Sequence, residues 1–191
     1  MKTKAISIIT VLAFSGLLVV WTILTVWTEA KGPPKSIDLG NGKKQVLIVY
    51  DPDPICNLDE KVCVTFGKAL AKRGIKVKVA TVSAADKLNA ADFEAYVFCA
   101  NTYNWRPDRA VTGFIEKTSI TDKPVIAITL GSGSTESSQK ALEKLILKKK
   151  GKLVGSRSFW LLRPNDELRM EESNVKVALS MVDEWAKSAL P

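Results

Sequence analysis

Residues that could bind a ligand gather in three short segments, each directly after an apolar run. The first, residues 51–59, reads Asp-Pro-Asp-Pro-Ile-Cys-Asn-Leu-Asp and contains three carboxylates. The second, residues 100–107, contains two aromatic residues, and the third, residues 130–135, is rich in glycine and serine. Aromatic rings can stack on a planar heterocycle, and glycine and serine ahead of a helix offer amides and hydroxyls to a polar group.

Each of the last two segments also has a purely structural interpretation. Tyr103 and Trp105 could pack over the end of a sheet, and Ser134 or Thr135 could simply cap the next helix. Both alternatives stay open at the level of sequence.

The residue inventory excludes several classes of site. Histidine is absent, which removes Ser-His-Asp and Cys-His nucleophiles and most zinc sites. The three cysteines, Cys56, Cys63 and Cys99, show no C-x-x-C spacing. The sequence is compatible with a disulfide bond between Cys56 and Cys99 and also with three free thiols. The net charge is +8, but no arginine-rich stripe or RNA motif is present, so we expect no nucleic-acid partner.

Alternating apolar runs and amphipathic segments predict an α/β domain over residues 44–191. Continuous apolar runs at 45–50, 96–100 and 125–130 are typical of interior parallel strands. The alternating run at 75–80 and the interrupted run at 152–162 indicate edge strands. The simplest arrangement is a doubly wound, five-stranded parallel sheet in the order 2-1-3-4-5. Helices are predicted at 59–73, 108–117, 135–150 and 170–189.

The amino terminus predicts a membrane anchor within residues 1–30. Residues 5–27 carry no charge, and as a helix they span about 34 Å. An uncleaved, single-pass transmembrane helix is favoured over a cleaved signal, with the lipid bilayer as its partner. Residues 31–43, rich in glycine and proline, are predicted to be a flexible tether. Lysines flank both ends of the helix, so sidedness is undecided, with a slight lean towards an extracytoplasmic domain.

Three motifs resemble the flavodoxin family, and especially its membrane-anchored flavodoxin-like members. They are Val46-Leu-Ile-Val-Tyr-Asp-Pro52, then Thr102-Tyr103 with Pro107 and Phe114, and then the loop from Gly131 to Ser134. The resemblance implies a flavodoxin-like fold and an FMN cofactor. Its phosphate would lie in the first loop and its ring between the other two. The cofactor-binding residues so implied are Cys56, Asn57, Leu58 and Asp59 for the phosphate, and Thr102, Tyr103, Asn104, Trp105, Gly131, Ser132, Gly133 and Ser134 for the ring.

The first loop departs from the family pattern of hydroxyl residues and glycine around the phosphate. Residues 54–59 read Pro-Ile-Cys-Asn-Leu-Asp, and proline has no N–H to donate. Carboxylates crowd the place of the phosphate, and like charges about 5 Å apart repel by about 3 kcal/mol at an effective dielectric of 20. Asn57 as N-cap and Glu60 three residues later predict a capping box that would serve the helix end internally.

A response-regulator interpretation shares the fold and would use the paired acids Asp51 and Asp53. It fails because that family needs an aspartate at the end of the third strand, where this chain has Cys99-Ala-Asn101. Two hypotheses of different class therefore follow. The first is electron transfer through FMN to or from a redox protein partner at the membrane. The second is a flavin-free binding or assembly module at the membrane.

Overall fold

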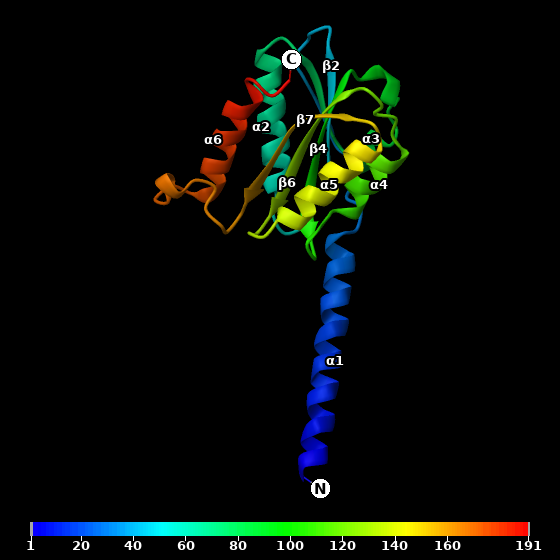
Figure 1. Cartoon of the computed structure of the whole chain (residues 1–191), viewed down its shortest axis with the longest axis vertical. Coiled ribbons are helices and arrows are strands. Elements are labelled where there is room, and N and C mark those ends of the chain that lie inside the picture. The colour runs from blue at the N-terminus through cyan, green and yellow to red at the C-terminus, as the bar shows by residue number, and fades with distance from the viewer. Residues whose placement is uncertain (1, 191) are drawn as a thin grey trace. The chain divides into compact units, whose positions relative to one another are not determined.

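The computed structural model describes residues 2–190, with side chains described from residue 9 onward. It divides into two compact units, Met1–Ala30 and Lys31–Pro191. The first unit is the helix α1, Lys2–Thr28 (Figure 1). Residues Ile9–Thr28 are long and apolar enough to cross a membrane, with a mean hydropathy of 2.3. The large apolar side chains of this stretch are all more than half exposed, so no protein surface covers them.

The second unit is built on a seven-stranded sheet in the order β1-β3-β2-β4-β6-β7, with β5 paired to β4 alone. Its five parallel strands, β3-β2-β4-β6-β7, have the predicted 2-1-3-4-5 order, so the flavodoxin-like fold is confirmed. The strand bounds are β1 Ser36–Leu39, β2 Gln45–Tyr50, β3 Lys76–Thr81, β4 Ala95–Tyr103, β5 Arg106–Pro107, β6 Pro124–Gly131 and β7 Lys152–Trp160.

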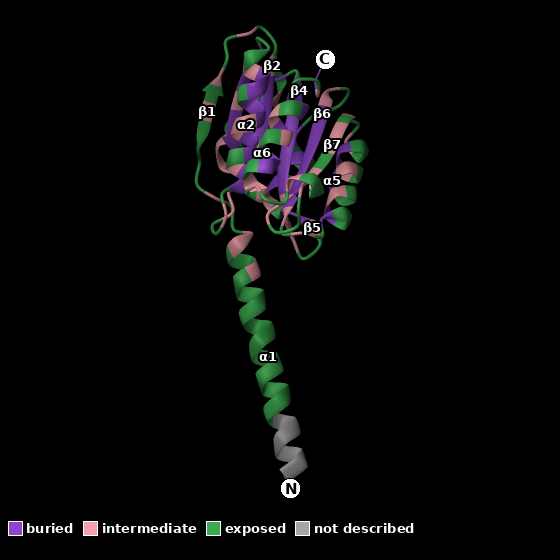
Figure 2. Ribbon diagram, turned by 90° about the vertical axis from the view of Figure 1, so that its left-hand side faces the viewer, coloured by how far each residue is buried: buried purple, intermediate pink, exposed green. Residues whose placement is uncertain are grey.

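Helices cover both faces of this sheet, with α2 and α6 on one face and α3, α4 and α5 on the other (Figure 1). Apolar side chains of the interior strands fill two cores between these layers, and the strands themselves are almost wholly buried (Figure 2). The helix bounds are α2 Leu58–Lys72, α3 Val82–Ala85, α4 Arg109–Lys117, α5 Glu136–Lys148 and α6 Asn174–Ala186, with short 3-10 turns η1 Ala90–Asp92 and η2 Glu167–Arg169.

The structure corrects two predictions, the flexible tether over residues 31–43 and the edge position of the strand at 75–80, because both regions take part in the pairing of β1. This four-residue strand lies within residues 31–43 and pairs antiparallel with β3, so that Asp38 lies opposite Lys78 and their side chains form an ion pair at 2.6 Å. The outer edge of β3 is therefore paired with β1, and β1 is the edge strand of the sheet. A strand of only four residues between glycine and proline gives little periodic signal, which explains why the sequence predicted a linker.

Close backbone contacts fix the turn that joins β1 to β2. Gly40 has a φ of +68°, and a Cβ added at Gly42 would lie 1.7 Å from the carbonyl oxygen of Gly74. Only glycine allows both the left-handed conformation and this approach. The turn is therefore part of the folded unit.

Replacing Gly42 by alanine tests whether residues 31–43 are folded. We expect Gly42→Ala to destabilise the chain by about 1–3 kcal/mol, because backbone must move to admit the methyl group. Gly113→Ala is the matched control, since a Cβ there meets nothing within 4 Å and alanine favours the helix by about 0.5–1 kcal/mol. Urea unfolding of the full chain in detergent, followed by circular dichroism, measures both; equal stability of Gly42→Ala and the parent would contradict the folded turn.

Candidate functional site

The three predicted loops meet at the carboxyl edge of the sheet. The hydroxyl of Tyr103 in the second loop donates to Oδ2 of Asp53 in the first at 2.6 Å, and Nδ2 of Asn101 donates to Oδ2 of Asp59 at 2.9 Å. The second and third loops touch as well, because a Cβ added at Gly131 would lie 3.3 Å from Cβ of Thr102. The structure thus brings the predicted site residues together, while their binding role stays a prediction.

Two carboxylates of the first loop take up its backbone N–H groups, and we call Asp53 and Asp59 the carboxylate clamp. Oδ1 of Asp53 accepts from the amides of Ile55 at 2.7 Å and Cys56 at 2.8 Å. Asp59 accepts from the amide of Asp53 at 2.6 Å and from that of Glu60 at 2.6 Å. The clamp therefore takes up the amides of Asp53, Ile55, Cys56 and Glu60 from within the loop.

The predicted capping box is wrong. Asn57 occupies the N-cap of α2 but its side chain makes no capping hydrogen bond. The carboxylate of Asp59 bonds the amide of Glu60 instead. The sequence did indicate that the loop would serve itself, but it assigned that role to the wrong side chains.

Two carboxylates at this edge, that of Asp51 and that of Asp59 of the clamp, are buried. Asp51 and Asp59 are only 2% and 1% exposed. Burial raises the pKa of Asp51 to about 7, with a further rise from the charge of Asp108, against a hydrogen bond from the Gly32 amide that lowers it. Burial also raises the pKa of Asp59, although its hydrogen bonds from Asn101 and two backbone amides oppose the rise. Part of this negative charge is therefore neutralised by protons near neutral pH.

The two aromatic residues of the second loop differ in environment. Tyr103 is half-buried and turned onto the first loop, and burial followed by its bond to Asp53 raises the pKa of its phenol. Trp105 is 69% exposed and has a φ of 60°, which is uncommon for a bulky residue. Of the two sequence interpretations, the structural one describes Tyr103, and Trp105 alone presents a ring to solvent.

The third loop is held by the segment that follows β7. The carbonyl of Gly131 accepts from the amide of Leu161 at 2.9 Å, and that of Ser132 accepts from two further amides of this segment. The indole Nε1 of Trp160 donates to Oγ1 of Thr135 at 2.9 Å, and the side chain of Thr135 makes no capping bond to α5. Sequence reasoning missed Trp160; its only signal was a tryptophan at the carboxyl end of the predicted strand 152–162.

The cysteines are free thiols in this structure. Cys99 lies in the core with Cys63 of α2, and the two thiols share a hydrogen bond. Burial raises the pKa of the Cys63 thiol. Cys56 is half-buried in the first loop. The core neighbour of Cys99 is therefore Cys63, which sequence reasoning had assigned only to the core.

These contacts allow a test of whether the edge fits the FMN that the fold family implies. The phosphate side does not fit, because the clamp occupies the amides of Ile55 and Cys56 and places carboxylates where a dianion would lie. On the ring side, two groups could contact a flavin. Oγ1 of Thr102 is buried without a hydrogen-bond partner among the described residues, and the Trp105 ring is open to solvent.

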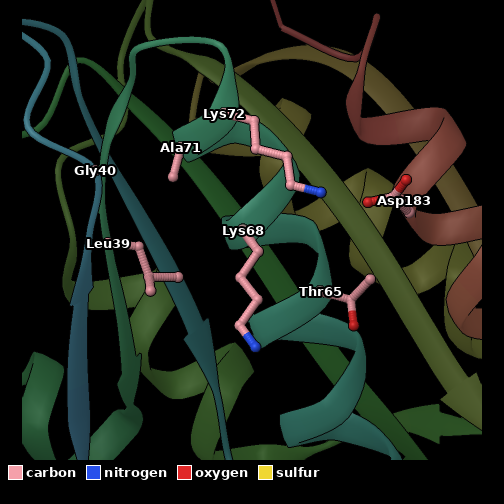
Figure 3. Close-up of a pocket in the computed structure, with 7 residues that line it drawn as sticks. All are labelled: Leu39, Gly40, Thr65, Lys68, Ala71, Lys72 and Asp183. Carbon is pink, nitrogen blue, oxygen red and sulfur yellow. The ribbon is translucent and has the colours of Figure 1, made fainter.

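A separate groove lies away from this edge, between β1, α2 and α6 (Figure 3). Its volume is about 420 Å³, and lysine side chains point along its wall. It shares no residue with the predicted site. The lining residues are Leu39, Gly40, Thr65, Lys68, Ala71, Lys72 and Asp183.

Comparison with solved structures gives flavodoxin-like proteins as neighbours of the second unit. A mutant flavodoxin from Pseudomonas aeruginosa matches with a TM-score of 0.56 at 15% identity, covering 76% of this chain and 98% of that one. General stress protein 14 from Treponema denticola, solved in complex with FMN, matches with a TM-score of 0.54 at 10% identity, covering 77% and 99%. At such identities the likeness establishes the fold alone.

Larger proteins contain the same unit. Rubredoxin oxygen:oxidoreductase from Desulfovibrio gigas matches with a TM-score of 0.56 at 14% identity; 78% of this chain is covered, but only 37% of that protein. Neither the family models nor the curated protein sequences give a match to this chain.

Replacing Asp51 by asparagine tests the buried charge. Because the pKa of Asp51 is raised from 3.8 to about 7 in the folded state, the parent loses stability as the pH rises from about 4 to about 7, and the loss persists above pH 7. An asparagine side chain would keep an acceptor for the Gly32 amide without a charge. We expect Asp51→Asn to raise the midpoint of thermal unfolding at pH 8 by several degrees, equivalent to about 2 kcal/mol.

The same substitution should have little stabilising effect at pH 4.5, where the parent carboxyl is already protonated in the folded state. Thermal unfolding of the full chain at the two pH values, followed by near-ultraviolet circular dichroism, gives the comparison. A gain of equal size at both pH values would show that the charge of Asp51 is not its cause.

Proposed function

We propose that this chain is a membrane-anchored flavodoxin-like module that does not use FMN and instead holds a binding surface at the membrane. The observation that carries the proposal is the carboxylate clamp. Its hydrogen bonds of 2.6–2.8 Å occupy the amides of Asp53, Ile55 and Cys56 from within the loop itself. An incoming phosphate would have to displace Asp53 and then lie against Asp59.

Membrane attachment in this proposal is supported by α1. Its apolar side chains from Ile9 to Trp27 are exposed along the whole stretch, and in water such a surface would be strongly unfavourable. A bilayer would cover it with hydrocarbon over about the length of 20 residues. The sidedness of the folded unit stays a prediction from the sequence.

A second candidate function, FMN-dependent electron transfer with a redox partner, is favoured by the ring side of the edge. Thr102 offers a buried hydroxyl without a partner among the described residues, and Trp105 offers an open ring beside it. General stress protein 14, which has this fold, was solved with FMN. Binding would then require the first loop to open and release the clamp.

FMN titration of the full chain in detergent separates the two candidates. We expect no quenching of flavin fluorescence and no shift of the visible bands at micromolar FMN, because the clamp excludes the phosphate. Saturable quenching with a dissociation constant of about 1 μM or below, which corresponds to about −8 kcal/mol, would reject the flavin-free proposal.

The variant Asp53→Ala tests the clamp directly. Removing this carboxylate frees the amides of Ile55 and Cys56 and removes one repulsive charge, so FMN affinity should rise by about tenfold or more, equivalent to about 1.4 kcal/mol. Asp38→Ala, which removes an exposed carboxylate of β1, is the matched control and should leave FMN affinity unchanged. An equal rise in both variants would mean that net charge, not the clamp, excludes the phosphate.

A further inference from the structure

Most large apolar side chains that are exposed on the described part of the folded unit lie in connections that follow the carboxyl ends of strands. Of seven such side chains, Ile55, Trp105 and Leu162 come soon after the ends of β2, β4 and β7, and Leu168 and Met170 lie further along the connection from β7 to α6. We call these five the apolar rim. They are Ile55 at 71%, Trp105 at 69%, Leu162 at 76%, Leu168 at 94% and Met170 at 68% exposed.

The two other exposed apolar side chains lie at the opposite edge. Leu147 is in the last turn of α5, and Val154 is near the beginning of β7. Helices of this sheet run antiparallel to the strands, so a helix ends at the amino edge. Single exposed residues of this kind are ordinary, whereas several in the connections that follow the carboxyl ends of the strands call for a partner.

The clamp is what turns part of this rim outward. Asp53 and Asp59 accept hydrogen bonds from within the loop, so the loop closes on its own carboxylates. Ile55, whose amide is held by Asp53, projects its side chain to solvent as a result. The carboxylates of Asp53 and Asp59 thus accept hydrogen bonds within the loop, while the side chain of Ile55 faces solvent.

The segment that leads to α1 is fixed at this same edge. The amide of Gly32 donates to Oδ1 of Asp51 at 3.1 Å, and the hydroxyl of Ser83 donates to the carbonyl of Gly32 at 2.5 Å. A Cβ added at Gly32 would lie 2.3 Å from Cγ of Pro52, so the backbone is in close contact with the first loop. Lys31, just before it, forms an ion pair with Asp86.

The covalent chain therefore limits how far this edge can be from the end of the anchor. Three peptide steps separate Thr28, the last residue of α1, from Lys31, and they span at most about 11 Å. This bound holds for any angle of the helix. The carboxyl edge is therefore the part of the folded unit to which the chain joins the anchor.

We propose that the apolar rim inserts into the interfacial layer of the bilayer that holds α1, so that the edge which carries FMN in flavodoxins here binds lipid. This inference rests on the membrane attachment proposed above. Tryptophan and aliphatic side chains are favoured at the boundary between headgroups and acyl chains. Arg163 and Lys35 have half-exposed side chains and form ion pairs with Glu136 and Glu60, and exchange of these surface pairs would let their charges reach lipid phosphates.

Site-specific quenching by lipid tests the proposal on the full chain in nanodiscs. The parent carries Cys56→Ser, because Cys63 and Cys99 are buried and unreactive towards label. A bimane label is attached through Ile55→Cys, Leu162→Cys or, as the matched control, Leu147→Cys. The nanodiscs contain lipids with or without bromine in the upper part of the acyl chain, and each variant is compared with the parent by circular dichroism.

We expect brominated lipid to quench the label at positions 55 and 162 by roughly twofold or more, since buried apolar rims reach about 5–10 Å into the interface. The label at position 147 should be unaffected. Adding Trp105→Asp and Leu168→Asp together should reduce quenching at position 55 while leaving the fold intact, because both side chains are exposed.

Carbonate extraction of the same variants reconstituted in liposomes of the same lipids separates failure of the anchor from failure of the rim. Release of the chain into the soluble fraction would overturn both the membrane attachment and the rim proposal. Retention of the chain with no quenching at positions 55 and 162 would overturn the rim proposal alone. Quenching of equal size at positions 55 and 147 would do the same, because it would show no preferred edge.

Discussion

Parallel pairing of the five central strands is the constraint on which this molecule depends. Because β3, β2, β4, β6 and β7 run in one direction, the loops that leave them must gather at one edge. Side chains more than forty residues apart, such as Asp53 and Tyr103, then come within hydrogen-bond distance. Apolar burial holds the strands together, and the sheet geometry alone decides which loops are neighbours.

The chemistry of that edge depends on where hydrogen-bond donors find acceptors. A loop amide near a helix amino terminus needs an acceptor, and either an anion or a side chain can supply it. In this chain Asp53 and Asp59 supply it, while burial of Asp51 and Asp59 raises their pKa values and limits the repulsion. The proposal of a flavin-free module rests on this internal bonding, since fold does not by itself fix function.

The segment after α1 connects this edge to the proposed membrane anchor. Its contacts with Asp51, Pro52 and Ser83 make residues 31–35 part of the folded unit, and β1 extends the sheet. A short, folded connection of this kind differs from a long flexible tether, which would leave the attached domain free to move. Under the proposal above, lipid would cover the exposed apolar side chains of the neighbouring loops.

Local patterns in the sequence were enough for the apolar helix, the order of the parallel strands and the identity of the three loops, because burial on both faces, helical periodicity and loop composition are all local signals. The acids of the first loop already indicated a poor phosphate site. Only the tertiary structure decided that Asp53 and Asp59, not Asn57, serve the loop, that Trp160 bonds Thr135, and that β1 covers β3. Those contacts join residues far apart in the chain or belong to a four-residue strand, and their energies depend on distances that no periodicity encodes.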